Sequence, residues 1–393
     1  MNSAAAPDRP RKEAGADDTV AARLCADVFT SLARSDQRAR ARQYVQGLLT
    51  TEGRKSFRNM AAQLGGGPTL EQRMHHFVSC STWDWVPVRQ ALTEVMAQAA
   101  PPEAWVLRPL LVPKDGSETV GVHQRHDPAL GRLLNLQYTV GLWSASAAAA
   151  HPLGWRLLLP RVWTDDPVRR ARVSIPATRR AETPGECAVE ACLETVARAP
   201  RTWPPRPVVV AVDGADVVGV IQQLRAARLP FLVKSDRAVP LAVVGQDTPG
   251  AASRPHSPHQ IIAAARNRPR PAGAHTPADD RTLAVRVRSP LRGTRSEHTP
   301  DDDLLLVGSA DAGHPPGDLW LTNMRDTPVA RLTALTALVA RSDDALARTT
   351  VPLGIKDFTG RTFDGWNRHT TLVSVAHCAV LLSQAAHRPP PEA

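Results

Sequence analysis

The sequence predicts an α/β protein in which a mixed sheet with helices follows an all-helical N-terminal domain. Two observations lead to this prediction. Between residues 19 and 99, apolar positions recur at helical spacing, and Gly- and Pro-rich breaks separate the segments. From Ala104 onward, short apolar or alternating runs replace that pattern, and one of them, Val208–Val212, leads into a helical segment and a further strand. A strand, a helix and a second strand in this order indicate a parallel unit.

The N-terminal region predicts several amphipathic helices. Asp36 is expected to cap the first of them, because its carboxylate can accept from the free N–H groups of a helix start. The glycines and proline of 65–68 break the helical pattern. Thr69 is then expected to cap the next helix, with Gln72 completing a capping box. Pro87 suits the first position of a third helix, where its missing N–H costs nothing.

The sheet is expected to begin with a three-strand antiparallel meander. A parallel strand, helix and strand follow it, with Asp213 at the end of the first of these strands. The meander strands are 105–112, 119–123 and 136–143, and the later unit comprises 208–212, 217–227 and 229–234. An antiparallel meander followed by parallel strands with intervening helices is the ribonuclease-H-like layout.

Residues 246–303 form a Pro- and Arg-rich segment that is expected to be loop, partly disordered, with 283–287 able to extend as a strand. Regular structure is expected to resume afterwards, and apolar patterns predict strands at 304–307 and 318–322 and helices at 329–340 and 369–384. The first 18 residues are small, polar and charged, and are expected to be a disordered tail.

The chain is basic, with 48 Lys and Arg against 38 Asp and Glu, a net charge of +10. Only five of the cations are Lys, and Arg forms bidentate contacts with phosphate and guanine. This balance favours a nucleic-acid partner, although a GC-rich genome would also explain the Arg bias. The five Cys include no CxxC pair, which indicates a reduced, cytoplasmic protein. No apolar run approaches the ~18 residues of a membrane-spanning helix, so no membrane partner is expected.

Several segments resemble the insertion-sequence transposases of group 701, which belong to the DDE nuclease class. They are residues 44–61 with Trp83-Asp84-Trp85, the run 104–114 with the hairpin region 119–137, residues 155–176, and residues 353–372. The resemblance covers most of 40–240 and 315–384. It implies a helical domain of DNA-binding type at 19–100 and a ribonuclease-H-like transposase domain at 101–245 and 304–386. The segment 246–303 is then an insertion and 387–393 a loose tail.

Such transposases cut and join DNA with two divalent ions held by Asp, Asp and Glu. The resemblance places Asp213 at the second ligand position and Asp343 at the third, where the family has Glu. Arg108 occupies the first position, so a fixed cation stands where a dication should bind, and Pro109 after it is disfavoured in a central strand. The simpler interpretations are a turn or capping Asp at 213, a helix-capping Asp at 343 and a salt-bridged Arg at 108.

Two basic clusters are candidate DNA-binding sites. The first opens a predicted helix, whose N–H groups could add phosphate contacts, and the second follows the capping Asp166. The candidate residues are Arg54, Lys55, Arg58, Arg169, Arg170 and Arg172. A solvated basic turn and a solvent-exposed Arg cluster are the competing interpretations.

The His and Cys residues give weaker signals. His75, His76 and Cys80 form a loose metal-like group, but a helix surface explains them better. His369 and His377 lie eight residues apart on an apolar segment and are expected to be core or capping groups.

Three functions remain open at this level. The first is a DNA-binding transposase relative with an impaired DDE active site, domesticated as a regulator. The second is an active transposase with Mg²⁺ as its cofactor. The third is a protein whose old catalytic crevice serves another ligand or a protein partner. Under the first two functions the expected partner is double-stranded DNA, and a homodimer is compatible with the sequence.

Overall fold

The computed structural model describes residues 11–127, 131–198, 203–236, 238–244, 255–266, 282–288, 303–309 and 317–387. Several predictions therefore fall outside the described residues: the first ten residues of the predicted tail, the turn at 128–130, most of 246–303, and the last six residues. The remainder of the predicted N-terminal tail overlaps the first helix, which begins at Arg11.

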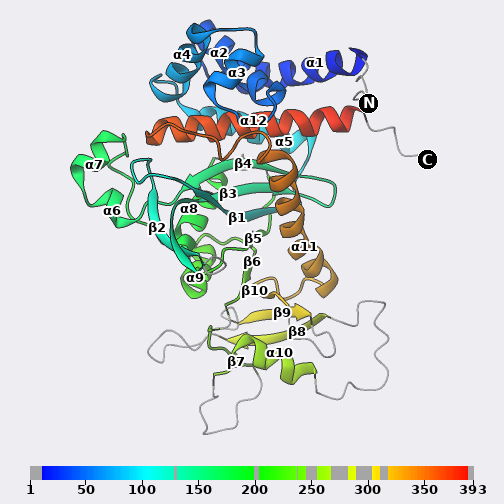
Figure 1. Cartoon of the computed structure of the whole chain (residues 1–393). Helices are drawn as coiled ribbons and strands as arrows, with labels where there is room; N and C mark the ends of the chain where they lie inside the picture. The colour runs from blue at the N-terminus through cyan, green and yellow to red at the C-terminus, as the bar shows by residue number, and fades with distance from the viewer. Residues whose placement is uncertain are drawn as a thin grey trace, which may run out of the picture.

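Helices form one layer at the N-terminal end of the chain, and the last helix lies between them and the sheet (Figure 1). The five N-terminal helices are α1 (Arg11–Val28), α2 (Ser35–Thr50), α3 (Phe57–Gln63), α4 (Pro68–Ser79) and α5 (Trp85–Ala99). Four of them, α1, α2, α4 and α5, pack against α12 (Phe363–Ala386), and α3 packs against α2 and α4. α12 is buried along most of its length and also contacts strand β4 (Ala150–Leu157). The apolar face predicted for α2 is confirmed, with Tyr44, Val45 and Leu48 buried.

The predicted starts of these helices were each wrong by two residues. Asp36 lies in the first turn of α2, and Thr69 and Pro87 lie inside α4 and α5, so no capping box forms at Thr69. The N-cap residues of α2, α4 and α5 are Arg34, Gly67 and Asp84. In α4 the reason is Pro68, whose fixed φ suits the first helical position and moves the helix start ahead of Thr69.

Ten strands in the described residues form one mixed sheet, in the order β2-β3-β1-β5-β6-β10-β9-β8-β7, with β4 also paired to β3. The pairs β1–β5 and β5–β6 are parallel, and the other pairs are antiparallel. The other strands are β1 (Ala104–Pro113), β2 (Val122–Asp127), β3 (Arg132–Ala145), β5 (Val208–Val210), β6 (Phe231–Lys234), β7 (Ala242–Val243), β8 (Thr282–Arg288), β9 (Leu304–Ser309) and β10 (Leu319–Thr322).

The predicted meander was wrong in its strand order and lacked a strand. β1 pairs with the buried half of β3, whereas the short, polar β2 pairs with the other half. The fourth strand, β4, pairs with β3 on the edge opposite β1. β4 was not predicted from the sequence, because Pro152 and Gly154 within it both weaken a strand pattern.

Helices cover both faces of the sheet, and two neighbouring residues of β4 show which helix lies on which face. The Trp155 indole donates to Ser374 of α12, whereas Arg156 contacts Glu194 of α8 (Pro184–Val196). Successive strand residues point to opposite faces, so α8 and α12 lie on opposite sides. The remaining helices are α6 (Arg161–Thr164), α7 (Pro167–Arg172), α9 (Val217–Ala226), α10 (Pro258–Arg266) and α11 (Val329–Ala345), which continues into a π-helical turn (Leu346–Thr350).

The strand-helix-strand unit is confirmed by β5, α9 and β6, and the strand expected at 283–287 is confirmed by β8. The sequence did not predict α10, which lies within the Pro-rich segment 246–303. No helix in the described part of the chain combines the length and the apolar character needed to cross a bilayer.

The core expectation for two histidines of α12 is confirmed. His369 is buried between the Tyr44 hydroxyl, 2.9 Å from Nδ1, and the Gly354 carbonyl, 2.9 Å from Nε2. His377 is buried between the Thr350 hydroxyl and the Ala150 carbonyl. Burial lowers the pKa of each imidazole to about 4, so both are neutral at physiological pH.

Candidate active site

Position 108 lies in the middle of β1, and the helix α11 brings Asp343 against it. Arg108 Nε donates to Asp343 Oδ1 at 2.8 Å, and Arg108 Nη2 donates to Asp343 Oδ2 at 2.9 Å. The arginine side chain is 20% exposed and the aspartate side chain 46% exposed. The first and third positions expected from the sequence therefore meet, but they meet as a bidentate ion pair between a cation and a carboxylate.

The neighbouring proline fits the same arrangement. Trp105 N donates to the Pro207 carbonyl and Ala211 N donates to the Leu107 carbonyl. Continuing this parallel pattern by one step would pair the amide of residue 109 with the Ala211 carbonyl, but proline has no N–H. Arg108 Nη1 donates to that carbonyl instead, at 3.0 Å. The guanidinium therefore satisfies both Asp343 and a backbone acceptor that Pro109 cannot.

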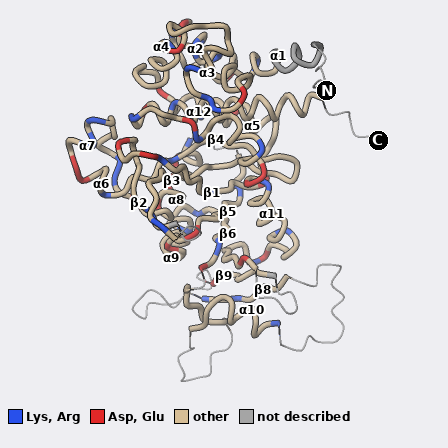
Figure 2. Tube along the Cα trace, in the orientation of Figure 1, with Lys and Arg blue, Asp and Glu red and all other residues tan. Residues whose placement is uncertain are grey.

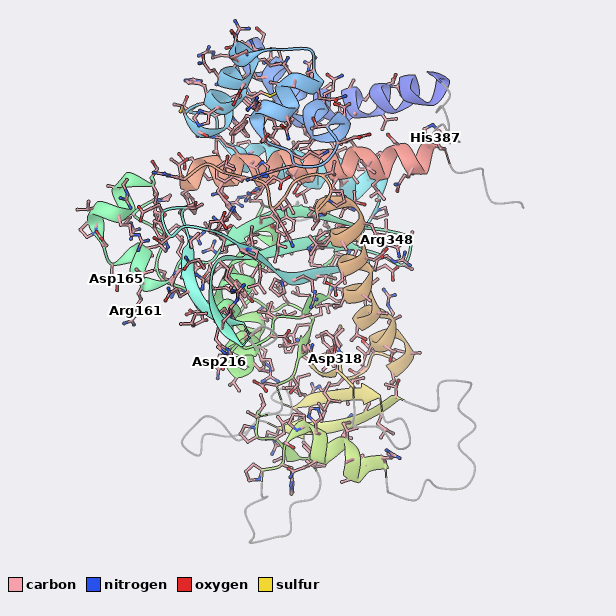
Figure 3. The ribbon with its side chains drawn as sticks, in the orientation of Figure 1. Arg161, Asp165, Asp216, Asp318, Arg348 and His387 are labelled. Carbon is pink, nitrogen blue, oxygen red and sulfur yellow. The ribbon has the colours of Figure 1, made fainter. Side chains whose placement is uncertain are left out.

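A second cation holds Asp213, which follows β5. Lys234, at the end of β6, lies with its Nζ 3.3 Å from Asp213 Oδ1 and 3.0 Å from Asp318 Oδ1. Asp318, labelled in Figure 3, immediately precedes β10. Burial disfavours the charged lysine, but the hydrogen bond to Asp318 and the charge of Asp213 raise its pKa overall. Lys234 is therefore a fixed cation at neutral pH.

The two cations belong to one face of the sheet. The register of β1, β5 and β6 places Arg108, Ala211 and Lys234 in one row across three neighbouring strands. Two cavities adjoin this row, one of about 450 Å³ lined by Asp213, Lys234 and Asp318, and one of about 360 Å³ lined by Asp318 and Asp343. Asp318 lines both cavities, and we call the region of these three carboxylates and two cations the crevice.

The residues of the crevice do not fit a pair of divalent ions. Both oxygens of Asp343 accept from Arg108, and Oδ1 of Asp213 and of Asp318 face the Lys234 ammonium. Divalent ions of this kind need carboxylate oxygens as ligands, and a cation in their place competes for the same oxygens. In the described residues no group of three or more His, Cys, Asp or Glu side chains is arranged to hold a metal ion.

Two other acids near β1 lie apart from this arrangement. Glu103 lies at the start of the strand, where it pairs with Arg331 and accepts from the Ala147 amide. Asp115 is exposed beyond the end of β1. Neither acid takes the place that the sequence resemblance expects for a first carboxylate.

Replacing Arg108 by Ala is expected to lower the free energy of unfolding by about 1–2 kcal/mol, measured by urea denaturation. The change removes charge-assisted hydrogen bonds to Asp343 and leaves the Ala211 carbonyl without its donor, but partial exposure of Asp343 weakens the effect. Arg348→Ala is the control, because its pair with Asp344 is exposed, and about 0.5 kcal/mol or less is expected. Equal losses in both variants would contradict this assignment.

Only part of the first predicted DNA-binding cluster is exposed for contact with DNA. Arg54 and Arg58 are exposed, whereas Lys55 is buried and its backbone N–H donates to Asp357 at 2.8 Å. The helix start that follows is already capped, since Ser56 accepts from the Asn59 amide. Within the described residues the cluster therefore presents two exposed guanidinium groups, and one N–H group of the helix start is already bonded.

The second predicted cluster is held mostly by contacts within the chain. Arg170 donates to the carbonyls of Thr164, Pro176 and Arg179. Arg169 stacks on the Trp163 ring, with 3.9 Å between its guanidinium carbon and the ring centroid. Arg172 pairs with Glu118 at 2.5 Å. The helix cap predicted for Asp166 is confirmed.

Sequence reasoning missed Lys234 and Asp318 as parts of the crevice. Lys234 had a usable signal, because it ends the parallel strand next to the one that leads to Asp213. Asp318 had none, since its approach to Lys234 depends on the antiparallel pairing of β10 with β6. His75 and His76 are exposed on α4, as the surface interpretation expected.

A comparison with models of protein families finds a match over most of the chain. Residues 27–297, more than half of the chain, match the family described as DDE superfamily endonuclease. The matched region runs from the end of α1 past β8 and includes Arg108, Asp213 and Lys234. No curated protein matches the chain.

Proposed function

Because the chain belongs to the DDE superfamily endonuclease family, we propose that it is a transposase-like DNA-binding protein whose DDE active site is impaired. Enzymes of this family act on DNA with divalent metal ions, so the crevice around Asp213 and Asp343 corresponds to the place where that chemistry would occur. Binding without cleavage would let the protein compete with active relatives for their DNA sites, which is the action of a regulator.

The proposal includes a finer assignment to the group 701 transposases and to a ribonuclease-H-like catalytic domain. The strand order β4-β3-β1-β5-β6 supports the fold, with antiparallel pairs on one side of β1 and parallel pairs on the other. The layer of α1–α5 supports a separate helical DNA-binding domain at 19–100, followed by the catalytic domain at 101–245 and 304–386.

The proposal of an impaired active site rests on one observation, the bidentate pair between Arg108 and Asp343. A divalent ion at this place would have to displace a guanidinium from both oxygens of Asp343 and would then lie beside its positive charge. Lys234 acts in the same way on Asp213 and Asp318. The crevice carries its own cations, and these neutralise the carboxylates that a metal would need.

The DNA-binding part is tested by titrating the full chain against a labelled duplex of mixed sequence at several NaCl concentrations, with EDTA present. The expected result is binding that weakens steeply as salt rises, because phosphate contacts release counterions. No detectable binding at low salt would overturn the proposed function. Binding that is insensitive to salt would also count against a phosphate-contacting role.

A further inference from the structure

The two DNA-binding clusters predicted from the sequence present few free cations. A different basic surface lies on the layer of N-terminal helices. α2 and α4 pack against each other and present their apolar sides, including Tyr44 and Met74, to the interior. Their outer sides enclose a groove of about 630 Å³, larger than either cavity of the crevice. Its lining residues are Arg34, Asp36, Gln37, Arg40, Thr69, Gln72, Arg73, His76, Phe77 and Ser81.

Helical spacing aligns the polar side chains along this groove. Gln37 and Arg40 are three residues apart on α2, and Thr69, Arg73 and His76 are spaced by four and three residues on α4. Residues at these spacings share one side of a helix. Two polar stripes therefore face a common groove, and only one lining residue, Phe77, is apolar.

The charges of the groove favour an anionic partner. Three arginines line it against a single carboxylate, Asp36, which Arg34 already holds at 2.8 Å. Arg40 bonds only to the neutral side chain of Gln43, and Arg73 is exposed without an acidic partner in the described part of the chain. Gln, Thr and Ser side chains add hydrogen-bond donors. This is the composition that protein surfaces use to contact nucleic-acid phosphates.

We propose that the groove between α2 and α4 binds the phosphate backbone of double-stranded DNA, with Arg40 and Arg73 as the principal contacts. This inference rests on the proposed function and names the surface that carries it. The groove and the crevice share no lining residue. α2 and α4 lie on the opposite side of α12 from β1, β5 and β6 (Figure 2), so DNA is held by the helical layer irrespective of what happens at Arg108.

The test measures duplex DNA binding by the full chain as a function of NaCl for wild type and the double variant Arg40→Ala/Arg73→Ala. Losing two phosphate contacts is expected to reduce the slope of log Kd against log salt by about 2 and to weaken binding uniformly across sequences. The double variant Arg40→Lys/Arg73→Lys keeps both charges and is expected to retain most of the wild-type slope.

The matched control is Arg341→Ala/Arg348→Ala, which removes the same charge from α11 and the π-helical turn after it. A similar loss of slope in this control would overturn the groove assignment, since it would show an effect of net charge alone. An unchanged slope in the groove variant, with normal binding by wild type, would overturn the inference but leave the proposed function standing. No binding by wild type overturns the proposed function itself. Circular dichroism of each variant confirms that it is folded.

Discussion

Replacing Arg156 by Met is expected to lower the free energy of unfolding by about 3 kcal/mol. Arg156 extends from β4 toward α8. Its side chain is 7% exposed, and its guanidinium contacts Glu182, which lies just before α8 and whose side chain is 1% exposed. Removing one partner of a buried pair costs about 3–5 kcal/mol, because the remaining charge stays desolvated. The lower end applies here, since Arg179 also contacts Glu182, at 3.3 Å. Met preserves most of the side-chain volume, so lost packing contributes little.

Equilibrium denaturation in urea, followed by circular dichroism, measures this change. Glu194→Gln is the matched control, because Glu194 also pairs with Arg156 but its side chain is 44% exposed. Its expected cost is below about 1 kcal/mol. A loss for Arg156→Met no larger than that of the control would show that the pair with Glu182 contributes little to stability.

Acidification from pH 6.5 to pH 4 is expected to remove several kcal/mol of stability. Burial lowers the pKa of His151 to about 3 and those of His369 and His377 to about 4, against about 6.5 in the unfolded chain. Because these folded-state pKa values are depressed, the unfolded chain takes up protons first as the pH falls. The stability is therefore complete above pH 6.5 and is lost progressively toward pH 4, by about 1.4 kcal/mol per unit of pKa difference.

Denaturation curves recorded between pH 7 and pH 4.5 test this prediction with little interference from Asp and Glu, whose ordinary pKa values lie lower. The exposed His75 offers a control, and His75→Gln is expected to leave the pH profile unchanged. A wild-type stability that stays constant down to pH 5 would contradict the burial of neutral imidazoles in α12 and β4.

The sequence predicts best those parts of the fold that depend on local pattern. The apolar run 208–212, the helix after it and the strand after that are all present as β5, α9 and β6, because each satisfies its own periodicity. The order of strands around β1 could not be predicted, since pairing with β3 rather than β2 is decided by distant contacts. α10 was missed because the Pro-rich composition of 246–303 favours loop.

In the crevice, too, some residues could be predicted from the sequence and others could not. Arg108 stood out in the sequence because the resemblance to the transposase family implies a carboxylate at its position. The structure gives it a partner, Asp343, 235 residues later in the chain. Lys234 and Asp318 could not be recognised, because their contact exists only once β6 and β10 pair. Lys55 looked available for DNA for a similar reason, since the element around Asp357 that buries it is distant in sequence.

The central claim is that Arg108 and Lys234 have replaced metal-binding chemistry in this crevice. Its most direct test incubates the purified protein with supercoiled DNA over a range of Mg²⁺ and Mn²⁺ concentrations and measures nicking and strand transfer. The Asp213→Asn variant and an EDTA sample serve as controls. The expected result is no nicking or joining above the EDTA level in either protein. Nicking that requires a divalent ion and is abolished by Asp213→Asn would contradict the claim and identify an active transposase.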